Sequence, residues 1–141
     1  MSPVAHAPAL VAGFGCQRGC PASELGDLLE EALRQQDLPR SALKGLASIE
    51  LKRNEPGLRQ LAARLGLPLV FFSAADLARF EPRLSHRSAL AHRHSGCYGV
   101  AESAALALAE HMGAGIAHLH VPRCSSARAT LALAMAEQNL R

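Results

Sequence analysis

The chain is poor in aromatic residues. Tryptophan is absent, and Phe, Tyr and Trp together make up only 4% of the 141 residues. Proteins that bind single-stranded nucleic acid stack its bases on aromatic side chains and carry a dense basic patch, whereas the net charge here is only +3. These absences argue against nucleic-acid binding, and they leave a hydrophobic core of Leu, Ala and Val.

Long apolar runs and targeting signals are also missing. No run is long enough to span a bilayer, and residues 1–8 lack the basic and apolar regions of a signal peptide. We therefore expect a cytoplasmic protein, in which cysteines stay reduced. Four residues are accordingly expected to be thiols and not a disulfide framework: Cys16, Cys20, Cys97 and Cys124.

Nucleotide and metal motifs are incomplete. The glycines of the segment Gly13-Phe14-Gly15 and the later Gly19 do not form a dinucleotide fingerprint, because the third glycine comes one residue late. The cysteines do not have the paired C-x-x-C spacing of a zinc ribbon. We predict no metal and no cofactor, and a solvated loop is favoured over a metal site for the three clustered histidines His86, His92 and His94.

Apolar periodicity predicts a three-layer α/β/α sandwich within one domain. Strands are expected at residues 9–14, 45–51, 67–72, 116–121 and 129–134, and helices at 22–36, 56–65, 73–80 and 100–112. Strand and helix alternate up to residue 80, which favours a mostly parallel sheet with helices on both faces. The last two strands could form a hairpin, so the central sheet of about five or six strands is expected to be mostly parallel or mixed.

The helix ends and two polar segments complete this prediction. Asn54 and Ser73 are expected N-caps, and Gly66 is expected just beyond a helix end. Residues 1–8 are predicted to be a flexible N-terminus. Residues 81–99 are long, polar and basic, as in functional or disordered loops, and we expect a mobile loop.

The glycine-rich turn after the first strand suggests an anion-binding site. A strand–turn–helix of this kind presents unpaired N–H groups and the positive end of the helix dipole, and Arg18 adds a cation. Because ligands lie beyond the carboxyl ends of strands in an open α/β sheet, three segments should meet there: 16–20, 50–55 and 95–100. A solvated turn with a surface ion pair is the competing interpretation for Lys52 and Glu55.

Three segments resemble a known family. GFGCQRGCPASEL, IELKRNEPGLRQLAARLGLPLVFFSAADL and GCYGVAESAAL are similar to CobE and to the C-terminal domain of CbiG proteins in cobalamin biosynthesis, over about residues 9 to 135. Two positions depart from the family pattern. Cys20 replaces the Ser or Thr that caps the first helix and is a weaker cap, and Gly99 replaces a Ser.

The resemblance implies a role in making the corrin ring of vitamin B12. Longer relatives open a ring lactone on a cobalt-precorrin by hydrolysis and release acetaldehyde. The length of this chain is expected to match the free-standing CobE form, which would bind, protect or hand on an intermediate. The implied partners are a polycarboxylated precorrin or corrinoid and other enzymes of the pathway.

Two other functions stay open at this point. One is a precorrin hydrolase or lyase, with Cys16 as nucleophile, activated by a helix N-terminus, and Glu50, Glu55 or Glu102 as acid or base. The other is a module that binds another pathway enzyme through an exposed apolar patch. With the resemblance included, the predicted ligand-binding residues are Gly15, Cys16, Gln17, Arg18, Gly19, Lys52, Arg53, Glu55, Gly96, Gly99, Val100 and Glu102.

Overall fold

The computed structural model describes residues 9–85, 99–113 and 115–136. A five-stranded sheet has the order β3-β2-β1-β5-β4. Its strands are β1 (Ala9–Cys16), β2 (Leu43–Ile49), β3 (Leu69–Phe72), β4 (Ala117–Ser125) and β5 (Ala129–Ala136). The first three are parallel, β5 is antiparallel to β1, and β4 is antiparallel to β5. The predicted α/β fold with a mixed sheet is therefore confirmed.

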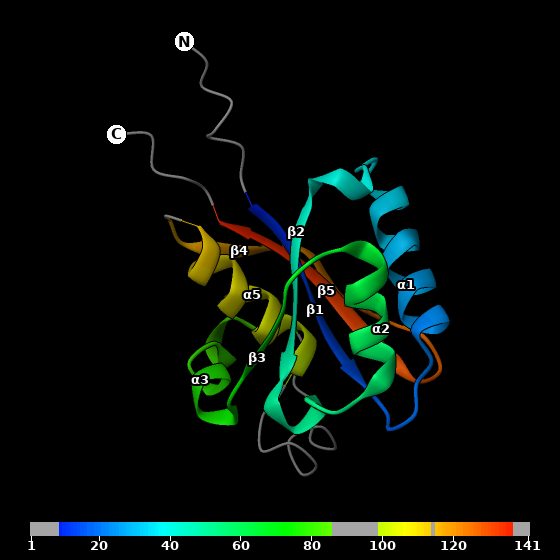
Figure 1. Cartoon of the computed structure of the whole chain (residues 1–141). Helices are drawn as coiled ribbons and strands as arrows, with labels where there is room; N and C mark the ends of the chain where they lie inside the picture. The colour runs from blue at the N-terminus through cyan, green and yellow to red at the C-terminus, as the bar shows by residue number, and fades with distance from the viewer. Residues whose placement is uncertain (1–8, 86–98, 114, 137–141) are drawn as a thin grey trace.

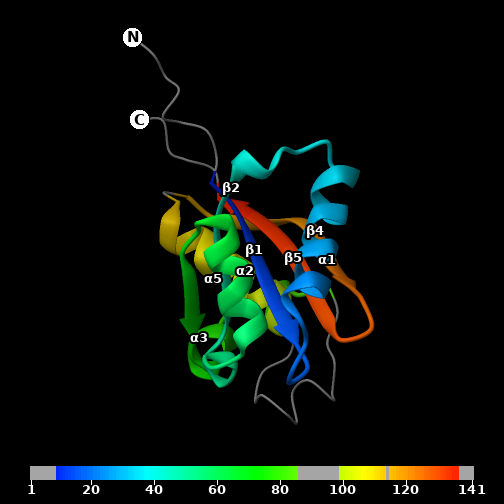
Figure 2. The same ribbon diagram turned by 45° about the vertical axis from the view of Figure 1, so that its right-hand side comes forward.

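Helices cover both faces of the sheet (Figures 1 and 2). α1 (Ala22–Gln35) and α2 (Pro56–Leu65) pack on one face, and α5 (Val100–Met112) and α3 (Ala74–Ala78) pack on the other. The alternation of β1 produces this division, because Leu10 and Ala12 belong to the core under α1 while Val11 belongs to the core under α5. No helix among the described residues is long and apolar enough to cross a membrane.

Gly13 sets the close approach of α5 to β1. A Cβ atom at this position would lie 2.1 Å from the Ala101 carbonyl oxygen and 2.5 Å from the Ala105 nitrogen. Both are backbone atoms of the helix, so no side chain could rotate away from the clash. The missing side chain lets α5 lie directly on the central strand, which carries its first turn to the carboxyl end of β1.

Several helix ends differ from the prediction. The N-cap of α1 is Pro21 and not Cys20, and the N-cap of α2 is Glu55 and not Asn54. Pro56 is the first residue of α2, as predicted, because its fixed φ suits this position and it has no N–H to satisfy, and the residue before it is therefore the cap. The predicted cap Ser73 is confirmed, since its hydroxyl accepts from the Asp76 N–H at 3.0 Å.

The end of β2 and the burial of β3 also differ from the prediction. β2 ends at Ile49, and a single 3₁₀ turn, η3 (Glu50–Lys52), follows it. The apolar run of β3 was typical of a strand covered on both faces, yet β3 is an edge strand and all four of its residues are only half-buried. Hydropathy alone does not distinguish a central strand from an edge strand whose side chains pack against both cores and under neighbouring arginines.

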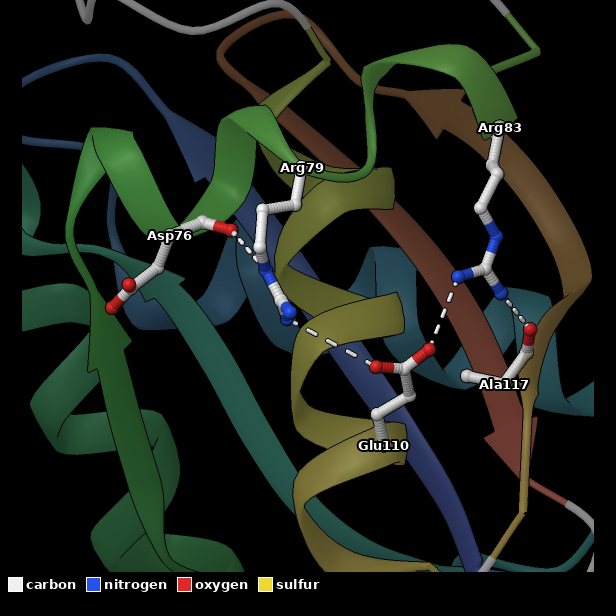
Figure 3. A network of polar contacts seen from close by, with 5 residues as sticks. All are labelled: Asp76, Arg79, Arg83, Glu110 and Ala117. Carbon is white, nitrogen blue, oxygen red and sulfur yellow. Dashed lines mark hydrogen bonds and ion pairs between the residues drawn. The ribbon is translucent and has the colours of Figure 1, made fainter.

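An arginine network attaches the segment after β3 to α5 (Figure 3). Glu110 lies between Arg79 and Arg83, with Nη-to-Oε distances of 3.9 Å and 3.1 Å. Arg83 also donates to the Ala117 carbonyl at the start of β4, and both guanidinium groups lie over the Phe80 ring. The predicted mobile loop begins here, but residues 81–83 form a 3₁₀ turn, η4 (Glu81–Arg83), and residues 86–98 lie outside the described part, as do residues 1–8.

Candidate functional site

A cavity of about 640 Å³ lies at the carboxyl ends of β1 and β2. Five segments line it, namely residues 15–18, 49–55 in part, 99–101, 123 and 125–130. The parallel strands bring the turns after β1 and β2 to one edge of the sheet, and α5 begins at the same edge. Of the predicted ligand-binding residues, the structure places eight on its wall: Gly15, Cys16, Gln17, Arg18, Lys52, Glu55, Gly99 and Val100.

Three cations of the cavity wall have no partner among the described residues. Within the described part of the chain, the side chains of Arg18, Lys52 and Arg123 make no hydrogen bond or ion pair, and Lys52 and Arg123 are half-buried. Partial burial removes water from a charge, which is unfavourable unless another group compensates. The cavity therefore presents uncompensated positive charge.

Two predicted residues of the second turn point elsewhere. The Arg53 guanidinium lies 5.7 Å from the Phe71 ring centroid and pairs with Glu50 at 3.4 Å. Neither Arg53 nor Glu50 lines the cavity. The 3₁₀ turn explains this result, because successive side chains of a turn point in different directions: Lys52, its last residue, faces the cavity, and Arg53, which follows it, does not.

Glu55 holds the first turn in place. Its Oε1 accepts from the Gly19 N–H at 3.0 Å, where Gly19 adopts a left-handed φ of 81°. A Cβ atom on Gly57 would lie 2.2 Å from the Cys20 carbonyl oxygen, so the first turn of α2 packs directly on this loop. The expectation that the Gly19 amide is available to a ligand is thus wrong, because a carboxylate of the protein already occupies it.

Glu102 is buried beneath the cavity and does not line it. Only 1% of this residue is exposed. Its Oε1 accepts from the Ser85 N–H at 2.7 Å, and its Oε2 accepts from the Arg123 N–H at 2.8 Å and from the Ser85 hydroxyl. The carboxylate therefore joins α5, the segment after η4 and β4, and the predicted direct contact of Glu102 with ligand has no support in this geometry.

Cys16 is the last residue of β1, and its side chain is half-buried on the cavity wall. Burial raises its pKa to about 11, which the Lys52 charge partly opposes and the Glu55 charge reinforces. Burial also raises the pKa of Cys20 and Cys124. The direction of the Cys16 shift is opposite to the one expected of a thiolate activated by a helix N-terminus, and desolvation is its largest cause.

Other predicted groups cannot be placed. Gly96, Cys97 and the three clustered histidines lie outside the described residues. Within the described ranges, no group of three His, Cys, Asp or Glu side chains could hold a metal ion.

Sequence reasoning allowed for the β4–β5 hairpin but did not place its tip at the cavity. Its tip reaches the cavity because β5 is antiparallel to β1, which pairs Cys16 with Ala129, and the Gln17 N–H donates to the Arg128 carbonyl at 2.8 Å. The sequence does contain a signal for this position. A polar Ser-Ser-Ala-Arg turn, which ends at Arg128 and follows Arg123, lies between the two strands that a hairpin would connect. Because β5 runs antiparallel to β1, the turn before β5 lies at the edge of the sheet where β1 ends.

Glu24 in the first turn of α1 anchors this hairpin. Its carboxylate accepts from the Arg128 N–H at 2.7 Å, from the Arg128 Nε at 2.8 Å and from the Ser126 hydroxyl at 2.5 Å. The Ser126 hydroxyl and the two Arg128 groups lower the pKa of the Glu24 carboxyl. Arg128 therefore has a partner within the described part of the chain, where the other three cations of the wall have none.

Comparison with known proteins identifies the family. The model of the family described as "Cobalamin synthesis G C-terminus" matches residues 10–134. The chain belongs to this family. It is 39% identical over 126 residues to Protein CobE of Sinorhizobium sp, which covers 89% of this chain and 79% of that protein.

Two further similarities extend this result. A crystal structure of CobE, a protein from the cobalamin (vitamin B12) biosynthetic pathway, has a TM-score of 0.89 and 48% identity, and the match covers 94% of this chain and 93% of that one. The cobalt-precorrin-5A hydrolase of Salmonella typhimurium is 44% identical over 72 residues, which are 51% of this chain but only 20% of the hydrolase. This member of the cobalamin synthesis G C-terminal family is thus involved in cobalamin biosynthesis.

The arrangement suits binding of a large anion better than nucleophilic chemistry. The cavity of this family member combines cations without partners, the first turn of a 13-residue helix and the apolar side chains of Ile49, Leu51 and Val100. Its thiol is protonated at neutral pH, and the Glu55 carboxylate is bonded to Gly19. Charge and apolar surface are therefore available to a ligand.

Proposed function

We propose that this chain binds a polycarboxylated precorrin or corrinoid intermediate in the cavity and carries or protects it for another cytoplasmic enzyme of the pathway. The observation that supports this most is a pair of half-buried cations, Lys52 and Arg123, which have no partner in the part of the chain that the structure describes. Acetate and propionate groups around a corrin ring would compensate these charges. Each charge-assisted hydrogen bond contributes roughly 1.5–3 kcal/mol.

The apolar part of the cavity suits the ring itself. Leu51 is 63% exposed although it is a large apolar side chain, and it lies on the cavity wall near the buried Ile49. If the ring covers this leucine, the burial contributes on the order of 1.5–3 kcal/mol to the free energy of binding. The volume also falls within the range of about 300–1,000 Å³ typical of ligand pockets, so one cavity offers both contacts that an acid-bearing macrocycle needs.

Titration with cobyrinic acid, a corrinoid with free peripheral carboxylates, tests this proposal by its absorbance spectrum. Lys52→Ala should weaken binding about 10- to 100-fold, from the loss of one charge-assisted bond. Lys44→Ala is the matched control, because Lys44 is an exposed lysine at the opposite end of the same strand, β2, and should bind like the parent. Absence of binding at tens of micromolar, or equal affinities of the two variants, would reject the proposal.

A second candidate function is hydrolysis of a precorrin. It is favoured by the 44% identity to part of a cobalt-precorrin-5A hydrolase, and Glu55 is the carboxylate on the cavity wall that could act as acid or base. Incubation of the chain with a cobalt-precorrin, followed by measurement of acetaldehyde, separates the two functions. Release that Glu55→Gln abolishes would support hydrolysis, and binding without release supports the carrier.

A further inference from the structure

Arg123, like Arg128, is a cation of the cavity wall for which sequence reasoning gave no role. It lies on β4 within an irregular stretch of pairing, where the register to β5 shifts between Val121 and Cys124. Its backbone N–H donates to the buried Glu102 at 2.8 Å. Its side chain is half-buried, lines the cavity and has no partner among the described residues.

Arg123 and Lys52 approach the cavity from distant strands. Lys52 follows β2 and Arg123 belongs to β4, and the order β2-β1-β5-β4 places three strand spacings between them. With neighbouring strands about 4.8 Å apart, β2 and β4 are separated by about 14 Å. Cations anchored that far apart suit two separated anionic groups on one ligand.

The irregular pairing explains why Arg123 has this position. The Arg123 N–H bonds to a side chain of α5, so this stretch of β4 is attached to the helix beneath the cavity. Glu102 has two carboxylate oxygens that accept from two segments, Ser85 and β4. A buried carboxylate with several donors is held rigidly, and it fixes the backbone from which the Arg123 side chain extends.

We propose that Arg123 is a ligand-binding residue that pairs with a carboxylate on the opposite side of the ligand from the one at Lys52, and that Glu102 is its positioning residue. This inference rests on the proposed function. The site then selects corrinoids whose peripheral acids are free over corrinoids in which they are amides, because an amide does not compensate a charge. Charge on both sides of the ring, and not the ring alone, is what the site recognises.

The experiment compares two probes: cobyrinic acid, with free carboxylates, and cobinamide, whose peripheral groups are amides. Both are titrated into the parent chain, Arg123→Gln, Glu102→Gln and the control Arg64→Gln, an exposed arginine of α2 away from the cavity. Arg123→Gln should weaken cobyrinic acid binding about 10- to 100-fold and leave cobinamide binding within about twofold. Glu102→Gln should also lower the ratio of the affinity for cobyrinic acid to the affinity for cobinamide. The double variant Arg123→Gln/Glu102→Gln should lose less affinity for cobyrinic acid than the product of the fold-losses of the two single variants.

The outcomes separate this inference from the proposed function. If the parent binds neither probe, both fail. If the parent binds cobyrinic acid and Arg123→Gln binds it like Arg64→Gln, the role of Arg123 is refuted and the proposed function stands. If Glu102→Gln weakens the binding of both probes equally, Glu102 supports the fold without positioning Arg123, and the positioning role of Glu102 is refuted.

Discussion

Substitution of Gly13 by Ala tests the packing on which the cavity depends. The new Cβ would lie 2.1 Å from the Ala101 carbonyl oxygen, whereas ordinary contacts begin near 3.4 Å. The backbone of α5 would thus have to retreat by about 1.3 Å, the difference between these two distances. Overpacking of a core typically costs 1–3 kcal/mol, and since only backbone can move here we expect about 3 kcal/mol.

Chemical denaturation followed by circular dichroism measures this loss. For a chain near this length, about 3 kcal/mol corresponds to a fall in Tm of about 12 °C, and total stabilities are only about 5–15 kcal/mol. Gly26→Ala is the matched control. Its Cβ would meet the Leu61 Cδ1 at an ordinary 3.5 Å, and alanine is the better helix former by about 1 kcal/mol.

The contrast between the two alanine variants decides the question. Gly26→Ala should be as stable as the parent or more stable, and Gly13→Ala should be clearly less stable. If Gly13→Ala unfolds at the same denaturant concentration as the parent, α5 does not lie directly on β1. The reasoning that brings the first turn of α5 to the cavity would then be refuted.

Three further predictions concern single side chains. Ser48→Ala removes a buried hydroxyl that donates to a β1 carbonyl at 2.8 Å, and the free energy of unfolding in urea should fall by about 1–2 kcal/mol; an unchanged value would contradict this. Because the Ser126 hydroxyl and Arg128 lower the pKa of Glu24, the ionised carboxylate stabilises the fold at neutral pH, and this contribution is lost as the pH falls below its usual pKa of about 4.3. Parent and Glu24→Gln should therefore differ in Tm at pH 7 and converge at acid pH, and a constant difference would refute the linkage. With a pKa of about 11, Cys16 should be alkylated by iodoacetamide at a rate that still rises above pH 9, measured by peptide mass spectrometry, and a plateau by pH 8 would show an activated thiol.

The layers and most helices were predictable from sequence because they follow from periodicity. Leu25 and Leu29 lie on the buried stripe of α1, and the alternation of β1 separates the two cores. Helix ends were less predictable. Neither Cys20 nor Asn54 caps its helix, because the backbone geometry of Pro21 and Glu55 begins the helices without a side-chain hydrogen bond.

The candidate site was predictable only where topology determines it. Carboxyl ends of parallel strands meet at one edge, so the turns that carry Arg18 and Lys52 were expected together, and the structure places both on one cavity. The hairpin residues were not expected, because their position depends on the direction of β5. A sequence indicates a strand by its pattern, but the choice between parallel and antiparallel pairing depends on long-range contacts that periodicity does not record.

The partners of the arginines separate structural from functional charge. Thirteen of the fifteen basic residues are arginine, a bias that by itself indicates nothing about a ligand. Arg83 bonds to Glu110 and the Ala117 carbonyl, and Arg128 bonds to Glu24, so their charges are already compensated within the fold. Arg123 is half-buried and has no such partner in the described ranges, so within them its charge is left available to an anionic ligand in the cavity.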